Sequence, residues 1–254
     1  MLVVMLASAV PSHAIGGIGF HLAPAFGPEV RKAGGPIMPD GSSNQDRILL
    51  MTSGVSGLQG VGVKVWLDFI PLVDVEATTN VQFGYYDMAF AVDTSFLGTG
   101  SYDTTSVEPD FNIPFTRNKP FYGRVSGDLA ALYPFFKIPL LKVYAGGGLS
   151  YIAATPVLNN SFAKAALTKA EDEGSFDAES ADADDIARVL RNALKDEGMA
   201  TGIGFFVQAG ARVKPPIIPL AIYANAKYGF GGPSVKGVSG GPGLTLELGG
   251  GIAL

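Results

Sequence analysis

The side chains that could do chemistry in this sequence are ten charged residues at alternate positions of otherwise apolar stretches. The basic members are Lys64, Arg124, Lys142, Arg212 and Lys227, and the acidic members are Asp68, Asp74, Glu76, Asp128 and Glu247. Charges that are buried must be paired and hydrogen-bonded. Five cations can pair with five anions, so we interpret the ten as a salt-bridged plug. The alternative is a narrow polar conduit lined by the same charges; Trp66 and Tyr144 share their parity and would obstruct either.

Histidine offers little catalytic capacity. The chain has two histidines, His13 and His21, and nucleophilic hydrolases and acyltransferases need a histidine beside a serine or a carboxylate. His21 stands among small residues, so we interpret it as a hydrogen-bonding group or a member of the ion network. The sequence holds no Walker loop, zinc-ligand spacing or His-Glu-x-x-His motif. We therefore expect no enzyme, no catalytic residue, no cofactor and no metal site.

Eight stretches alternate between apolar and polar residues with a period of two, which is typical of β-strands with two different faces. Residues 61–69 show it most clearly. Three connections are short and share a tripeptide: Ile70-Pro71-Leu72, Ile138-Pro139-Leu140 and Ile218-Pro219-Leu220. The other four connections are long and polar. Short turns on one side and long loops on the other predict an all-β, eight-stranded antiparallel transmembrane β-barrel, with short periplasmic turns, long extracellular loops and both termini periplasmic.

The composition fits such a barrel. The 254-residue chain is 47% hydrophobic and 16% charged, with a mean hydropathy of +0.28, which is apolar for a soluble domain. After residues 1–14, no run of about 20 apolar residues offers a helical span. The alternative is a soluble barrel with its apolar face inward. That barrel would carry many lysines and glutamates outside, whereas the polar parity here has sparse, balanced charges.

The first residues look like a targeting segment. An apolar core precedes Ser12-His13-Ala14, a small-x-small cleavage pattern. We interpret residues 1–14 as a signal peptide and residues 15–254 as the barrel domain. The expected basic start of a signal is missing, and the alternative is a buried first strand.

Aromatic residues on the apolar parity gather near the strand ends. Two girdles at the membrane interfaces are what a lipid-facing band predicts. The predicted girdle residues are Phe26, Phe69, Phe83, Tyr85, Phe121, Tyr133, Tyr151, Phe205, Tyr228 and Phe230.

The long loops differ in character. The first, residues 27–57, is rich in Gly, Pro and Ser and is expected to be mobile. The third, residues 155–200, carries helix formers, an apolar stripe and Gly198 as a stop, which predicts an acidic helical hairpin over the outer mouth. Its acidic cluster is Asp177, Glu179, Asp182, Asp184 and Asp185. A calcium site is one interpretation, but the order of an EF-hand is absent; a solvated acidic loop is the other.

With these features the chain resembles the small eight-stranded outer-membrane β-barrel proteins, the class of the OmpA transmembrane domain, OmpX and OmpW. The resemblance rests on topology, and Leu254 stands where that class usually ends in an aromatic residue. It implies a location in the bacterial outer membrane, lipid contacts, biogenesis by the barrel-assembly machinery and a monomer. The charged polar parity is closer to OmpX than to OmpW.

This resemblance suggests three functions. We expect a closed structural or surface-interaction scaffold that meets an extracellular ligand through residues 155–200. The alternative is a narrow passive pore for small polar solutes or ions, and the remote alternative is an outer-membrane lipid-modifying enzyme acting through His21. The net charge is −5 and no basic face exists, so a nucleic-acid partner is not expected.

Overall fold

The computed structural model describes residues 16–30, 32–40, 48–68, 72–92, 119–215, 218–233 and 243–253. These ranges contain the barrel strands and the two helices of the third long loop. The predicted signal at residues 1–14, the girdle residue Phe69, the first short turn through Ile70 and Pro71, and Leu254 lie outside the described residues.

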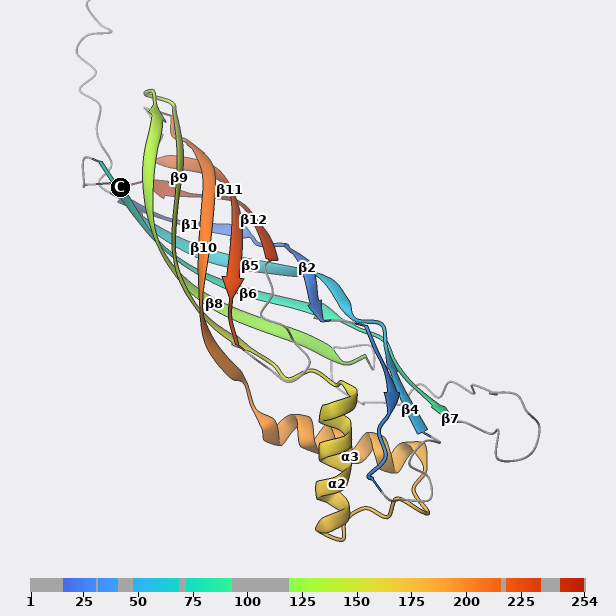
Figure 1. The fold of residues 1–254 in the computed structure, drawn as a ribbon. Helices are drawn as coiled ribbons and strands as arrows, with labels where there is room; N and C mark the ends of the chain where they lie inside the picture. Colours follow the sequence, from blue (N-terminus) through green and yellow to red (C-terminus); the bar gives the residue numbers. More distant parts are fainter. Residues whose placement is uncertain are drawn as a thin grey trace, which may run out of the picture.

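The chain forms a closed antiparallel β-barrel with a helical insertion, as predicted (Figure 1). The first strands of the barrel are β1 (Gly16–Leu22), continued by β2 (Ala25–Val30), then β5 (Val55–Leu67), β6 (Asp74–Tyr85) and β8 (Phe121–Lys137). The others are β9 (Leu141–Ala154), β10 (Ala200–Val213), β11 (Leu220–Gly231) and β12 (Gly243–Ala253).

Closure comes from the first strand. β1 pairs with β12 on one side, with Gly17 opposite Ala253, and with β5 on the other, with Gly16 opposite Leu67. These contacts place the start of β1 and the end of β12 at the barrel end that carries the short turns, away from the helices (Figure 1). Every strand of the barrel thus has two hydrogen-bonded neighbours, and no edge is left along the described ring.

The period-two pattern separates an apolar outside from a polar inside. In β5, Val61, Val63 and Val65 are exposed, whereas Lys64 and Trp66 between them are buried. The alternation recurs most clearly in β6, β10 and β11, and the large exposed side chains of the outer wall are Val, Leu, Ile, Phe and Tyr. A soluble barrel would have the opposite arrangement, with its apolar face inward.

Small residues let bulky side chains fit in the lumen. A Cβ at Gly17 would lie 2.2 Å from the Trp66 ring, and one at Gly62 would lie 2.3 Å from His21 Nε2. Both distances are far inside van der Waals contact. The glycine content of the strands is therefore a packing requirement of the filled interior.

Parts of the first long loop that the structure describes form strands, whereas its composition predicted a mobile segment. Residues 33–52 contribute β3 (Ala33–Pro36) and β4 (Ile48–Thr52), which form a second sheet with β7 (Met88–Val92). The sequence did not indicate these strands, because Gly and Pro content was weighed above the apolar residues between them. Leu50 of β4 and Phe90 of β7 are almost completely buried, and that burial favours order.

The third long loop forms the predicted helical hairpin. α2 (Asn160–Asp172) begins after Asn159, whose side chain accepts a hydrogen bond from the Phe162 N–H. α3 (Ala183–Glu197) begins after Asp182, whose carboxylate accepts the N–H groups of Asp184 and Asp185. These side chains satisfy donors that a helix start leaves open. Among the described residues, no helix is long and apolar enough to cross a membrane.

The helices and the small sheet share one apolar core, and we call this unit the cap. The core includes Leu50, Phe90, Phe162, Leu167, Ile186 and Leu190, and it continues down to Tyr122 and Leu58 at the barrel rim. Tyr86, between β6 and β7, is buried in it, and its hydroxyl oxygen accepts the Leu158 N–H at 3.2 Å. Lys164 of α2 also pairs with Asp40, which follows β3. The described parts of the first and third long loops and β7 are therefore one folded body seated on the barrel.

Leu190→Ala should loosen the cap without opening the barrel. Leu190 is completely buried in the cap core, and such truncations cost about 2–5 kcal/mol. We expect faster tryptic cleavage at Arg188 and Arg191, while the heat-dependent gel shift of the folded barrel persists. Asn192→Ala, at an exposed position of the same helix, is the control. Equal cleavage rates for the two variants would show that the cap has no cooperative core.

Tyr86 should make the stability of the cap depend on pH in the alkaline range. Burial raises its pKa to about 12, against an ordinary 10. Between these values an unfolded cap ionises Tyr86 and a folded cap does not, so stability present below pH 10 is lost as the pH rises, up to about 2–3 kcal/mol. Tyr86→Phe should lack this component of the alkaline loss, measured by urea unfolding at several pH values. Identical pH profiles for both proteins would contradict the assignment.

Candidate functional site: the charged lumen

The ten charged residues named from the sequence project from seven barrel strands or their ends toward one lumen. Nine of them are joined by ion pairs in a continuous chain. The pairs link Lys142 with Asp74 and Asp68, Arg212 with Asp68 and Glu76, Lys64 with Glu76 and Glu247, and Lys227 with Glu247 and Asp128. The tenth, Arg124, donates from Nε and Nη2 to Gln82 Oε1 at 2.9 and 2.6 Å.

One end of the ion chain lies near the short turns of the barrel. Lys142 Nζ lies 2.7 Å from Asp74 Oδ2 and 3.2 Å from Asp68 Oδ1. Arg212 reaches Asp68 at 3.2 Å and also pairs with Glu76. Two cations thus share three carboxylates, and Asp68 and Asp74 are both engaged at this end.

The central part lies where the lumen is driest. Lys64 Nζ lies 2.9 Å from Glu76 and 2.7 Å from Glu247, and all three side chains are at most 1% exposed. Lys227 Nζ joins Glu247 at 2.8 Å to Asp128 at 2.6 Å. Each cation bridges two carboxylates, so removal of any one member leaves a buried charge poorly compensated.

Aromatic rings fill the space between the ions. The Arg212 guanidinium lies 4.5 Å from the Trp66 ring centroid and 5.5 Å from that of Tyr144, and Lys227 Nζ lies 4.7 Å from that of Phe206. A cation at this distance from a ring is attracted by its quadrupole. Trp66 and Tyr144, which the sequence indicated as obstructions, are at most 1% exposed, so water does not reach this level of the lumen.

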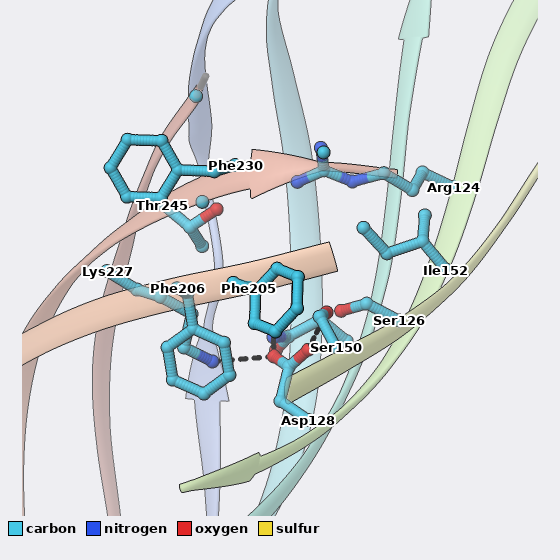
Figure 2. A pocket seen from close by; sticks show the side chains of 14 residues that line it. Arg124, Ser126, Asp128, Ser150, Ile152, Phe205, Phe206, Lys227, Phe230 and Thr245 are labelled. Carbon is cyan, nitrogen blue, oxygen red and sulfur yellow. Dashed lines mark hydrogen bonds and ion pairs between the residues drawn. The ribbon is translucent and has the colours of Figure 1, made fainter. Parts of the chain in front are cut away.

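A small polar cavity of about 50 Å³ lies at the end of the ion chain that is nearer the cap (Figure 2). Arg124, Ser126, Ser150 and Lys227 are among its lining residues, and Asp128 accepts a hydrogen bond from Ser150 there. In Figure 2 a dashed line marks the ion pair that joins Lys227 directly to Asp128. The cavity has room for a water or two, or a single small ion.

His21 is a structural member of the lumen. It is 5% exposed, and its ring nitrogens lie 3.1 Å from the Tyr223 hydroxyl and 2.7 Å from Asn80 Oδ1. Its hydrogen-bond partners are therefore a phenol and an amide, not the serine or carboxylate that nucleophilic catalysis needs. This geometry matches the hydrogen-bonding interpretation.

Neutral polar side chains complete the network, and the charge pattern alone did not assign them this role. Gln208 donates to Glu76 at 3.1 Å, and Asn225 donates to Glu247 at 2.8 Å while accepting from the Tyr144 hydroxyl at 2.7 Å. They occupy the same parity as the charges, and that alternation was the available signal. Their function is to satisfy the lone pairs that the lysines leave open.

The aromatic residues named as girdles have the expected exposure. All of the nine described ones are exposed on the outer wall, Phe26, Phe83, Tyr85, Phe121, Tyr133, Tyr151, Phe205, Tyr228 and Phe230. Sequence reasoning missed Phe135 and Phe136, which are also exposed, near the β8–β9 turn. Whether these rings lie at membrane interfaces stays a prediction.

The acidic cluster of the third loop serves the loop itself. Asp182 caps α3, and Asp177 accepts hydrogen bonds from the Ser180 hydroxyl and the Glu179 N–H, which lower the pKa of Asp177. In the described part of the chain, no group of three or more His, Cys, Asp or Glu is placed to hold a metal ion.

Glu76→Ala should destabilise the barrel strongly. Glu76 binds Lys64, Arg212 and Gln208, and a broken buried pair costs about 3–5 kcal/mol. Denaturant unfolding of the protein in lipid vesicles measures this loss. Glu76→Gln should cost less because it keeps the volume. Thr79→Ala, on the outer face of the same strand, is the control, and equal midpoints for Glu76→Ala and Thr79→Ala would show that the ion chain is energetically silent.

Comparison with known proteins gave similarities to solved structures alone: no protein-family model and no curated protein matched the sequence. One similar structure is Ail, the attachment invasion locus protein of Yersinia pestis, with 11% identity, 93% of this chain and 96% of that chain covered, and a TM-score of 0.41. Another is Neisserial surface protein A, with 13% identity, 94% and 97% coverage, and a TM-score of 0.42. A third is the outer membrane protein OprG of Pseudomonas aeruginosa, with 12% identity, 93% and 94% coverage, and a TM-score of 0.42.

The fold of this chain is established by its own closed ring of antiparallel strands with one polar and one apolar face. The predicted resemblance to small eight-stranded outer-membrane β-barrels is confirmed for that fold.

Proposed function

We propose that this protein is a closed outer-membrane barrel that presents its cap as a surface-interaction scaffold. The observation that carries the proposal is the dry ion chain in the lumen. Lys64, Glu76, Glu247, Trp66 and Tyr144 are each at most 1% exposed, whereas residues that line an aqueous channel are wetted. A water-filled path past this level would need the chain to break.

The outer wall supports the membrane location. Exposed apolar side chains cover the barrel strands, for example Phe20, Leu129, Ile203 and Leu248, each more than half exposed. A soluble protein rarely exposes a continuous apolar surface of this extent. Closed barrels satisfy every strand edge, which lipid requires. We place the short turns and both chain ends in the periplasm and the cap outside the cell.

The cap supports the interaction role. Its helices and small sheet are held by an apolar core, and residues 155–200 carry ten acidic and five basic side chains. A rigid, acidic surface loses little entropy on binding and selects ligands of opposite charge. An extracellular ligand would therefore bind through this loop. Outer-membrane lipid, the barrel-assembly machinery and a monomeric state belong to the same proposal.

A narrow pore for small polar solutes is the second candidate. The polar cavity at the outer end of the lumen favours it, because Arg124, Lys227 and Asp128 there could receive an ion. Passage beyond that cavity would require the Lys227 pairs with Asp128 and Glu247 to open. The lipid-modifying enzyme is the least supported candidate, given the partners of His21.

Single-channel recording in a planar bilayer separates scaffold from pore. We expect the folded protein to be silent, because the intact ion chain of Lys64, Glu76 and Glu247 blocks the lumen. Folding of each sample is checked by the heat-dependent gel shift. Discrete ion-selective steps from the unmodified protein, with a preference altered by Arg124→Ala or Glu247→Ala, would overturn the closed scaffold in favour of the pore.

A further inference from the structure

The β8–β9 hairpin extends past the neighbouring strand β6 at the end of the barrel away from the cap (Figure 1). The pairing of β8 with β6 stops where Leu132 lies opposite Asp74, yet β8 continues to Lys137 paired with β9 alone. The register between these two strands shifts between Pro134 and Phe136. The hairpin tip is therefore without a paired strand on the β6 side, whereas β10 accompanies it on the other side, with Val213 opposite Leu141.

This tip is unusually apolar for a turn. Tyr133, Phe135, Phe136, Ile138 and Leu140 are each at least 46% exposed. The register shift is what exposes two consecutive phenylalanines, since regular alternation would turn one of them inward. The apolar outer wall of β8, including Leu129, runs without interruption into the tip. Whatever solvent surrounds that wall should therefore surround the tip as well.

Cations follow one row across three strands at the same end. Lys137 lies opposite Lys142, and Lys142 lies opposite Arg212. Lys214 follows two residues after Arg212, and its N–H bonds to the Leu140 carbonyl. Partial burial lowers the pKa of Lys214, and the positive charges of Arg212, Lys142 and Lys137 lower it further, against the raising effect of Asp68. Like charges placed side by side are unfavourable unless anions intervene.

Two of these cations lack such an anion. Asp68 and Asp74 are engaged by Lys142 and Arg212. Within the described part of the chain, neither Lys137 nor Lys214 has an ion-pair or side-chain hydrogen-bond partner. The rim thus combines exposed aromatic rings with two uncompensated lysines, and an amphipathic surface of this kind matches the headgroup layer of a membrane.

We propose that the β8–β9 tip with Lys137 and Lys214 is a binding site for the phosphate groups of anionic phospholipids. The aromatic and aliphatic side chains of the tip lie among the acyl chains, and the lysines extend to the headgroup phosphates. This inference rests on the membrane location proposed above. A water-soluble partner is disfavoured, since the tip continues the lipid-facing wall.

The lysines are tested by unfolding the full chain in vesicles of phosphatidylcholine with and without phosphatidylglycerol. We expect the anionic lipid to stabilise the unmodified protein, and Lys137→Gln/Lys214→Gln to lose that gain, about fivefold per lysine in the unfolding equilibrium constant. In phosphatidylcholine alone the double variant should not be less stable than the unmodified protein, because removing two lysines relieves the repulsion within the row of cations. Lys169→Gln/Lys195→Gln removes the same charge from the cap helices and is the control. Equal responses of the two double variants would overturn the site.

The tip is tested by placing a fluorophore in it. Phe135→Trp should add a blue-shifted emission that brominated phospholipids quench, whereas the emission of Trp66, which is buried in the lumen and is present in the unmodified protein, is the background to subtract. A red-shifted, unquenched emission would place the tip in water and favour a soluble protein partner instead. If the chain fails to insert into any vesicle, the membrane location itself fails. If it inserts without responding to phosphatidylglycerol, only the phosphate site fails.

Discussion

Charge directed into a closed barrel of eight strands must be neutralised inside it, and the rest of this structure depends on that constraint. A ring of this size is barely wider than its own side chains, and the central ions here are almost completely excluded from water. Each lysine therefore bridges two carboxylates, and amides such as Asn225 and Gln208 take up the remaining lone pairs. Glycines such as Gly62 leave the room that this packing needs.

The same ion chain ties the strands to one another across the lumen. Glu76 in β6 binds Lys64 in the adjacent β5 but also Arg212 in β10, and Lys227 in β11 binds Asp128 in β8. These contacts join residues far apart in the sequence, so they act on register and closure together. A one-residue slip of any strand would turn its charges toward the apolar outside, which lipid would not tolerate. The network thus specifies the barrel as much as it fills it.

The sequence predicted the barrel well because alternation is a local signal. The parity of Val61, Lys64 and Trp66 is visible without neighbours, and it was sufficient to separate the two faces. The pairing of Lys64 with both Glu76 and Glu247 was not predictable, because it depends on which strands meet across the ring. The helices of the cap were predicted, because α3 has a clear apolar stripe. The strands β3 and β4 were not predicted, because they lie in a segment rich in glycine and proline, and the buried Leu50 was given too little weight. The exposed Phe136 was missed because a register shift, absent from any local pattern, places it outward.

Because the lumen is filled, the two ends of the molecule are where it can bind other molecules. With the interior committed to its own ion pairs, new contacts can form only at the cap, along the apolar wall or at the short-turn rim. The cap is acidic and folded around its own core, whereas the rim carries Lys137 and Lys214 beside exposed rings. In the membrane location and lipid site proposed above, this opposition of charge favours phosphate headgroups at the cationic end and disfavours them at the anionic cap. Because the five cations and five anions named in the lumen balance, the difference in net charge between the two ends comes from the cap and from the short-turn end.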